Sequence, residues 1–597
     1  MIQANLDQRS SILAKKFRRI LLSLCLLSFP ITGCLLEPKI APKPAAMVQH
    51  AIHRPQSDVE TWPLPVDSLG NCRLEDAKIA LSQARMARLF HSPKAAAYYR
   101  DALVHTLYAL NASEKCGGCR DHSSESIRLH NQSLEGLLLT SGFGVGQDAR
   151  AASEKLAALG FQMSSANGFI DEFEPDELWP AHDFMTVNVK DPAREKGLGL
   201  PLIVYRKPRP RLQIVPEMFY PPHWKFAATA VARLANSENG EGFVPVIELV
   251  DPLENDHVVM GQTTIPLAKD LTTPVISLLS HSGYRDKARQ GLLRPNTLTD
   301  EEGVTLVHPY RSGRIPLILI HGMGCSPRIM ADIVNSVHAD PELRQRYQVM
   351  VVYYTTGDTI LQDAGVIRRA FNAMRSHYDP SHTDLAWDKT VVLGHSLGGP
   401  IARLLTSHSD HQMEQLLFTK PWNELVMSDE IRQASESVIF FEPVAEINRV
   451  IYLAATMRGS RIADHFEARF LSSVLPRRKM LEQFHSEIIA NNGIEVFQPV
   501  YRDRVPSSID NQSPESPVLA VTNQLKIKEG LISHSIQANV TPLFPQKKST
   551  DGLVPFASSL IDEAVSQVIL PLQDHFCTHD RRTLNEIARI LKENLAE

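Results

Sequence analysis

The spacing of hydrophobic residues changes along the chain, and each spacing predicts a different kind of structure. From Leu74 to about Gly160 the apolar positions recur near a period of 3.6, which is typical of amphipathic helices. Further along, short apolar runs alternate with clusters of Pro, Gly, Asn and Asp, which favours strands joined by turns. We therefore expect a helical region over residues 66–165 and a small, sandwich-like β-rich module over residues 166–297.

Beyond about residue 298 short, continuous apolar runs alternate with helical stretches. The runs lie at residues 316–320, 347–354, 389–393 and 450–454. Because such strands lack a polar face, they predict a mostly parallel sheet with helices on both faces. Residues 298–597 are therefore expected to form an α/β domain. Two segments rich in apolar and amphipathic stretches, near 409–447 and 461–525, are expected as insertions between its core elements.

The N-terminus has the pattern of a secretory signal. Basic residues gather in Lys15–Arg19, the apolar run Ile20–Leu27 follows, and Pro30 interrupts what comes next. This run is too short to span a bilayer as a mature helix, so residues 1–33 are expected to be a signal peptide. The signal ends in Ile-Thr-Gly followed by Cys34, which resembles the lipobox of bacterial lipoproteins.

That resemblance implies that Cys34 carries acyl chains and becomes the mature N-terminus, anchored in the bacterial cell envelope. Several acyl chains together give stable membrane anchoring. In a Gram-negative cell, Leu35 in place of Asp would favour the outer membrane. Residues 34–65 contain six prolines and no sustained apolar period, which favours an extended, semi-rigid linker between anchor and body.

The composition limits the kinds of ligand and partner that the protein is expected to bind. With 597 residues and 43% hydrophobic residues, the chain can bury several cores. Its net charge of −5 argues against nonspecific nucleic-acid binding, which needs a basic surface. Cys116 and Cys119 have redox or metal spacing, but no second such pair exists, so a local disulfide or two inert thiols is favoured. We recognise no metal site and no phosphate-binding loop, and expect no cofactor. Protein partners are not identifiable.

The strongest chemical motif is Gly394-His-Ser396-Leu-Gly398. It follows the apolar run Val391–Leu393 and precedes a helix-like stretch, which is the context of a nucleophile elbow. Both glycines suit a tight turn that lifts the Ser396 hydroxyl clear of the sheet. We expect Ser396 to be a nucleophile.

A second motif, His321-Gly-Met323-Gly, ends the apolar strand that opens the α/β domain. Glycines at a strand end let backbone N–H groups approach a developing oxyanion. We assign one donor to the N–H of Met323 and the other to the N–H of Leu397, the residue after the nucleophile. His321 is expected to be structural.

In the order typical of this elbow, the acid and then the base follow the nucleophile. Asp551 lies in a loop after an expected late strand and is our candidate acid, with Asp574 as its competitor. His575 lies between a short strand and the final helix and is our candidate base. His579, nearer the helix start, is the alternative.

Together these pieces resemble the lipase-type branch of the α/β-hydrolase superfamily, and in particular bacterial lipoprotein hydrolases. The resemblance covers roughly residues 314–597. It implies an α/β-hydrolase fold with a helical cap and hydrolysis of carboxylic esters, with lipid or hydrophobic acyl esters as substrates. In such relatives the cap shapes an acyl pocket, which here would be lined by residues of the second insertion: Phe466, Phe470, Leu471 and Leu475.

Two other functions fit the same sequence. An acyltransferase could use the same three residues with an acceptor other than water. A non-catalytic lipoprotein could bind a partner through its N-terminal regions, although the complete set of Ser396, Asp551 and His575 argues against an idle enzyme. Many lipase relatives also carry Pro-His-x-Gly where this chain has Thr456–Ser460, so substrate preference does not transfer from them.

Overall fold

The computed structural model describes most of the chain beyond the N-terminal segment. The described residues are 39–42, 70–111, 124–170, 174–208, 217–236, 243–261, 263–280, 302–460 and 477–597. The expected signal peptide, with Cys34, lies outside them, as do Cys116, Cys119 and the four residues expected to line an acyl pocket. Among the described helices none is long and apolar enough to cross a membrane.

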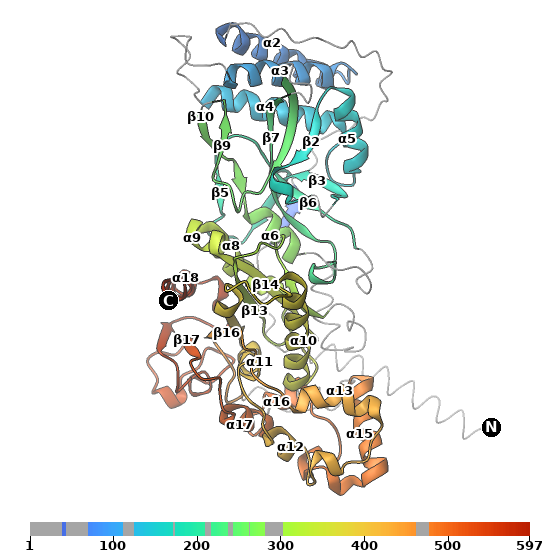
Figure 1. Cartoon of the computed structure of the whole chain (residues 1–597). Helices are drawn as coiled ribbons and strands as arrows, with labels where there is room; N and C mark the ends of the chain where they lie inside the picture. The colour runs from blue at the N-terminus through green and yellow to red at the C-terminus, as the bar shows by residue number, and fades with distance from the viewer. Residues whose placement is uncertain are drawn as a thin grey trace, which may run out of the picture.

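The N-terminal part combines helices with a five-stranded sheet (Figure 1). The helices are α2 (Gly70–Leu89), α3 (Ala95–Asn111), α4 (Ser124–Ser141), α5 (Ala149–Ala158) and α6 (Thr272–Leu279). The sheet has the order β2 (Gln162–Ser165), β8 (Phe243–Val250), β7 (Lys225–Asn236), β6 (Leu200–Tyr205) and β3 (Glu177–Pro180). Only β2 and β8 pair in parallel. Three two-stranded sheets accompany it: β1 (Lys39–Pro42) with β4 (Phe184–Val187), β5 (Arg194–Glu195) with β11 (Lys269–Asp270), and β9 (His257–Met260) with β10 (Thr263–Pro266).

The expectation of a sandwich-like module was wrong. In the described part of the chain, helices α3, α4 and α6 contact the five-stranded sheet, where a sandwich would have a second sheet. Leu103, Leu107 and Leu134 are fully buried on these helices. The apolar stripes of the helices thus supply the apolar surface that a partner sheet would otherwise provide.

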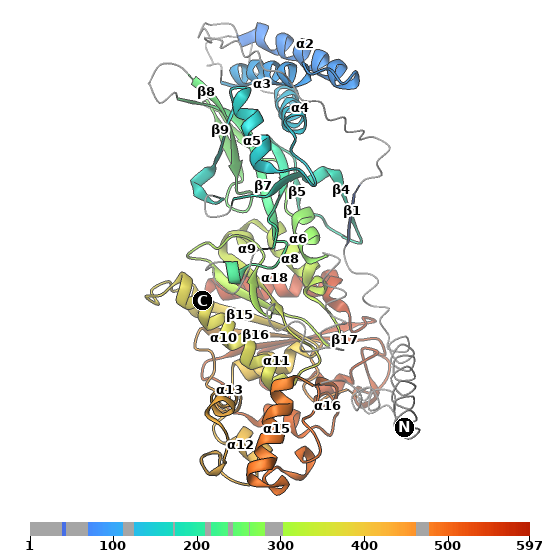
Figure 2. The same cartoon turned by 90° about the vertical axis from the view of Figure 1, so that its right-hand side faces the viewer.

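Part of the expected linker is also ordered against the body. Residues 39–42 form β1, which pairs antiparallel with β4 (Figure 2). Pro42 at the end of this edge strand is compatible with pairing, since an edge strand can lack one donor. The extended linker therefore contributes one short strand.

The C-terminal part is built on a seven-stranded sheet. Its order is β12 (Gly303–Leu306), β14 (Tyr347–Tyr353), β13 (Ile315–Ile320), β15 (Thr390–His395), β16 (Ile447–Leu453), β17 (Ile532–Asn539) and β18 (Ser566–Pro571). All neighbours pair in parallel except β12, which is antiparallel to β14. The four strands expected from continuous apolar runs are present, and the four central strands are almost completely buried.

Helices cover both faces of this sheet. They are α8 (Ala331–Ala339), α9 (Pro341–Arg346), α10 (Ile360–Tyr378), α11 (Gly398–Leu405) and α18 (Arg581–Ala596). Figure 2 shows α8 and α18 on one side and α10 and α11 on the other. Helix α6 packs on α8, and a buried His308–Asp251 contact of 3.0 Å also joins the N-terminal and C-terminal parts.

Among the described residues, five short helices form a cap at the far end of the molecule from α2 (Figure 1). They are α12 (Gln412–Leu417), α13 (Asp429–Ile439), α15 (Lys479–Asn492), α16 (Ser508–Asn511) and α17 (Pro517–Gln524). All five lie in the two expected insertions. The chain leaves the sheet after β15 and after β16 to build them.

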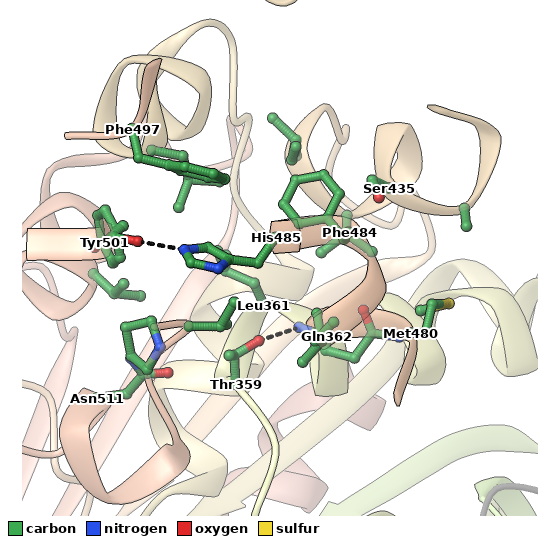
Figure 3. Close-up of a pocket in the computed structure, with 18 residues that line it drawn as sticks. Thr359, Leu361, Gln362, Ser435, Met480, Phe484, His485, Phe497, Tyr501 and Asn511 are labelled. Atoms are coloured by element: carbon green, nitrogen blue, oxygen red, sulfur yellow. Dashed lines mark hydrogen bonds between the residues drawn. The ribbon is translucent and has the colours of Figure 1, made fainter. Parts of the chain in front are cut away.

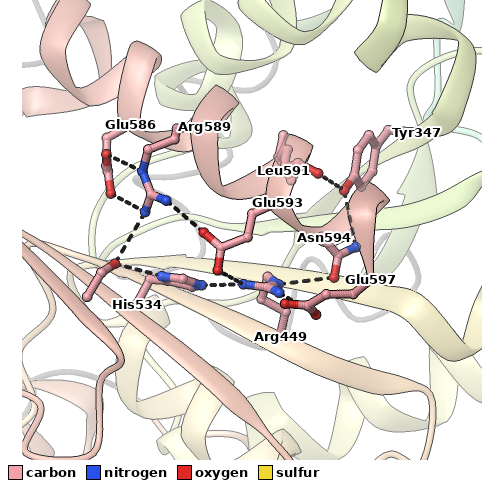
Figure 4. A network of polar contacts seen from close by, with 10 residues as sticks. Tyr347, Arg449, His534, Glu586, Arg589, Leu591, Glu593, Asn594 and Glu597 are labelled. Carbon is pink, nitrogen blue, oxygen red and sulfur yellow. Dashed lines mark hydrogen bonds and ion pairs between the residues drawn. The ribbon is translucent and has the colours of Figure 1, made fainter.

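A buried polar network ties the last helix to the sheet (Figure 4). Arg449 on β16 is fully buried and donates to Asn594 at 3.0 Å, to Glu597 at 2.7 Å and to His534 Nε2 at 2.5 Å. Burial, with the nearby Arg449 charge, lowers the pKa of His534 to about 4. Its ring is therefore neutral, and Nε2 can accept the hydrogen bond from Arg449. The network fixes α18, and with it the loop that precedes α18.

Candidate active site

Ser396 stands on a strained turn between β15 and α11. Its φ of +56° is a left-handed conformation that residues with a side chain rarely adopt. Its N–H donates to Leu453 O at 3.0 Å, and its own carbonyl accepts from Gly399 N at 2.9 Å, so the neighbouring strand and helix hold the turn. Such strain persists only where the surroundings determine it, and it presents the hydroxyl at the carboxyl edge of the sheet.

The flanking glycines are required by close backbone contacts. A Cβ on Gly394 would lie 2.3 Å from Gly398 O, and one on Gly398 would lie 2.4 Å from Ile320 O. Real Cβ atoms do not approach backbone oxygens this closely. The GxSxG spacing is therefore dictated here by how tightly β15, α11 and β13 pack.

Ser396, His575 and Asp551 form one chain of hydrogen bonds. His575 Nε2 lies 2.8 Å from Ser396 Oγ, and His575 Nδ1 lies 2.6 Å from Asp551 Oδ2. The other oxygen, Asp551 Oδ1, accepts from Leu553 N at 2.9 Å and Val554 N at 2.6 Å. All three side chains are buried. Asp551 held in this way orients the ring so that Nε2 can take the serine proton.

The two competitors lie elsewhere. Asp574 is exposed, and its carboxylate accepts from Phe576 N and Gln573 Nε2. His579 ends a 3-10 turn, and no hydrogen bond joins it to Ser396 or Asp551 among the described residues. The structure thus brings together the preferred acid and base and leaves the alternatives outside.

The His321-Gly-Met323-Gly turn lies against the nucleophile. A Cβ on Gly322 would be only 2.8 Å from Ser396 Cβ, so the glycine permits this approach. Within the part of the chain that the structure describes, the backbone N–H groups of Met323 and Leu397 donate to no protein acceptor. Both remain available to an oxyanion formed at Ser396.

Two buried histidines beside the site are held neutral. Burial lowers the pKa of His321 to about 4 and, with the nearby His575, lowers the pKa of His395 to about 3. His321 Nδ1 lies 2.9 Å from Gly322 O, consistent with a structural role. His395 Nε2 donates to the carbonyl of His575 at 3.0 Å and so positions the base. The sequence analysis did not assign this positioning role to His395. The only signal for it was that the residue lies inside the GxSxG motif.

An ion-pair cluster joins the cap to the loop after β14. This loop contacts the His321–Gly324 turn, which we call the oxyanion turn. Arg478, at the start of α15, forms ion pairs with Glu302 and Asp358, and all three side chains are buried. Burial raises the pKa of Asp358 to about 7, against the opposing effect of Arg478. Asp358 ends the segment after β14 that contains Thr356. Because none of these residues lies in a recognisable motif, the sequence offered no signal for the clamp.

Thr356 links the clamped loop to the oxyanion turn. Its Oγ1 accepts from Gly324 N at 3.2 Å, and its carbonyl accepts from Ser508 Oγ of the cap helix α16. Nearby, Tyr354 OH donates to His321 O at 2.5 Å. The turn that carries Met323 is therefore held by Tyr354 and Thr356 of the segment after β14, and the cap contacts this segment through Ser508.

An apolar pocket lies inside the cap (Figure 3). Both insertions and the start of α10 line it, with Phe484, Phe497, Leu361 and Met480 among its walls. His485 Nε2 donates to Tyr501 O at 2.8 Å within it. None of the three hydrogen-bonded site residues lines this pocket. It is thus an apolar space adjoining α16, separate from the walls of the serine site itself.

No group of three or more His, Cys, Asp or Glu side chains suited to a metal ion occurs among the described residues. Cys325 and Cys577 are buried, and Cys577 is a free thiol. Burial raises the pKa of Cys577 far above its usual range, so this thiol stays protonated. The side chains at the site therefore offer acid, base and hydroxyl chemistry.

No protein-family model and no curated protein matches the sequence. Several solved structures of lipases and esterases are similar to about half of this chain. The mature lipase BlEst2 of Bacillus licheniformis is 12% identical, covers 48% of this chain and 95% of its own, and gives a TM-score of 0.26. Esterase B from Lactobacillus rhamnosis is 14% identical over 48% of this chain and 77% of its own, with a TM-score of 0.25. The esterase Est2 of Thermogutta terrifontis is 14% identical. The match covers 49% of this chain and 87% of the esterase, with a TM-score of 0.23. These TM-scores are low.

Proposed function

We propose that this protein is a serine hydrolase of the α/β-hydrolase fold that cleaves carboxylic esters through an acyl-enzyme. The observation that carries the proposal is the hydrogen-bonded chain from Ser396 Oγ through His575 to Asp551. A serine hydroxyl is a weak nucleophile on its own. It becomes effective when a base within hydrogen-bond reach is itself oriented by a third group.

The proposed reaction uses each group at a stated atom. His575 Nε2 takes the proton of Ser396 Oγ as the oxygen attacks the ester carbonyl, and Asp551 stabilises the resulting imidazolium. The N–H groups of Met323 and Leu397 receive the oxyanion, and the imidazolium then protonates the leaving alkoxide. Water, deprotonated by His575, attacks the acyl-enzyme, and the proton returns to Ser396 as the acid leaves.

We further propose hydrophobic acyl esters as the substrates. The apolar interior of the cap supports this indirectly. Its pocket adjoins α16, whose Ser508 contacts Met323 of the oxyanion turn, and apolar side chains make up most of its lining. The lipobox-like sequence supports lipidation at Cys34 and a place in the bacterial cell envelope, at the outer membrane in a Gram-negative cell. A membrane-anchored enzyme would then meet lipid esters where they occur.

The test is hydrolysis of p-nitrophenyl esters with short and long acyl chains. We expect turnover by the native protein and its loss in Ser396→Ala, because the nucleophile is gone. The matched pair His575→Ala and His579→Ala separates the two candidate bases: only the first should lose turnover. Equal turnover by the native protein and Ser396→Ala would reject the proposal. Addition of an alcohol acceptor tests the acyltransferase alternative, which predicts that ester product exceeds free acid.

A further inference from the structure

Exposed apolar side chains gather at the carboxyl ends of β17 and β18. Leu543 is 97% exposed, the highest value for a large apolar side chain among the described residues, and Phe544 beside it is 58% exposed. Leu572, just after β18, is 78% exposed. Single exposed apolar residues are ordinary, whereas a group of them on one edge marks an interaction surface.

The sheet brings together the two strand ends that these residues follow. Asn539 pairs with Pro571 between β17 and β18, and Leu572 N donates to Asn539 O at 2.7 Å. The loop after β17 folds back on itself, since Ser549 Oγ donates to Phe544 O at 3.0 Å. We name Leu543, Phe544 and Leu572 the apolar rim.

The backbone around the rim is conformationally restricted. Leu572 has a φ of +61°, which is unfavourable for a residue with a branched side chain. Pro542 and Pro545 flank the tip formed by Leu543 and Phe544, and proline restricts the backbone before any partner binds. A preorganised tip loses little conformational freedom on docking.

Positive charge lies next to the rim. Lys547 and Lys548 are exposed, and neither forms an ion pair or side-chain hydrogen bond within the described residues. Asp574 is the single acid in residues 540–549 and 569–574, although the chain as a whole carries a charge of −5. Apolar residues flanked by lysines match an anionic lipid surface. The apolar side chains can insert into it, and its negative charge attracts the lysines. A second copy of the chain would bring the same lysines toward one another, which is unfavourable.

The rim also borders the site. Asp551 follows Ser549 by two residues, and His575 follows Leu572 by three. We propose that the apolar rim, together with Lys547 and Lys548, docks this protein on an anionic lipid surface with the serine site next to that surface. The inference rests on the proposed function for the identity of what is hydrolysed, but the docking itself does not require Ser396.

The experiment measures binding of the full chain, with Cys34→Ala to prevent acylation, to phosphatidylcholine vesicles with and without phosphatidylglycerol. We expect Leu543→Asp/Phe544→Asp to weaken binding about tenfold or more, because acids replace the inserting side chains. Lys547→Gln/Lys548→Gln should weaken binding to the phosphatidylglycerol vesicles alone. Leu385→Asp, an equally drastic change at an exposed site near the amino end of β15, is the matched control and should bind normally.

Turnover of a soluble short-chain ester should be unchanged in the rim variants, which shows that they fold. Undiminished vesicle binding by Leu543→Asp/Phe544→Asp would overturn the inference. A change of these variants from dimer to monomer, with vesicle binding intact, would overturn it in favour of an interface between copies. Ser396→Ala should bind vesicles normally. If Ser396→Ala instead kept full turnover, the proposed function would fail while the docking result stood.

Discussion

Removal of the Arg478 guanidinium should destabilise the fold strongly, and by an amount that depends on pH. Arg478 is 9% exposed, and its partners Glu302 and Asp358 are buried still more deeply. In Arg478→Met both carboxylates would remain buried without their cation. Breaking a buried pair in this way costs about 3–5 kcal/mol, much more than a surface pair contributes. We expect a loss of that size near pH 8, which lies above the pKa of Asp358 in the folded protein.

The pH dependence follows from Asp358. Its pKa in the folded protein is about 7, above the ordinary value of 3.8, so the folded state binds more protons than the unfolded state between these values. Stability therefore falls as pH rises through that window. Without Arg478 the pKa of Asp358 rises further, and protonation relieves the unpaired charge. As pH falls, the folded variant binds a proton at Asp358 that the folded native protein does not yet bind. The destabilisation caused by Arg478→Met should therefore shrink by about 1.4 kcal/mol for each pH unit over which this difference lasts.

The assay is the free energy of unfolding from urea titrations at about pH 8 and about pH 6. Arg504→Met is the matched control, because Arg504 is 44% exposed and pairs with Asp510 at the cap surface. That variant should lose no more than about 1 kcal/mol at either pH. The reasoning would be refuted if Arg478→Met cost no more than Arg504→Met at about pH 8, or if its cost were the same at both pH values.

Three further changes test other parts of the structure. Asp551→Asn should lower kcat for ester hydrolysis by about 10⁴-fold, because the ring loses its orienting charge, whereas Asp574→Asn should retain activity; steady-state kinetics distinguishes them. Gly394→Ala should destabilise the protein by about 1–3 kcal/mol or more, since its Cβ meets Gly398 O at 2.3 Å, and thermal unfolding would show normal stability if the packing argument were wrong. Arg449→Met should cost about 1–3 kcal/mol through hydrogen bonds lost under the last helix, and an unchanged urea midpoint would contradict that role.

Local sequence determined the nucleophile turn. An apolar strand, a glycine on each side of Ser396 and an apolar helix predict a bend whose backbone only small flanking residues allow. The same holds for the central strands, because a strand buried on both faces must be apolar throughout. These features depend on residues near one another in the chain, so their pattern is visible without coordinates.

Tertiary structure alone decided which distant groups meet. Asp551 and Asp574 are both carboxylates in late loops, and the parallel pairing of β15, β16, β17 and β18 selects the one that reaches His575. The Arg478 clamp and the helices on the N-terminal sheet depend likewise on packing between segments far apart in sequence. Periodicity reports which face of an element is apolar and not what covers it. This is why a sandwich was expected for the β-rich module, whose sheet is in fact covered by helices.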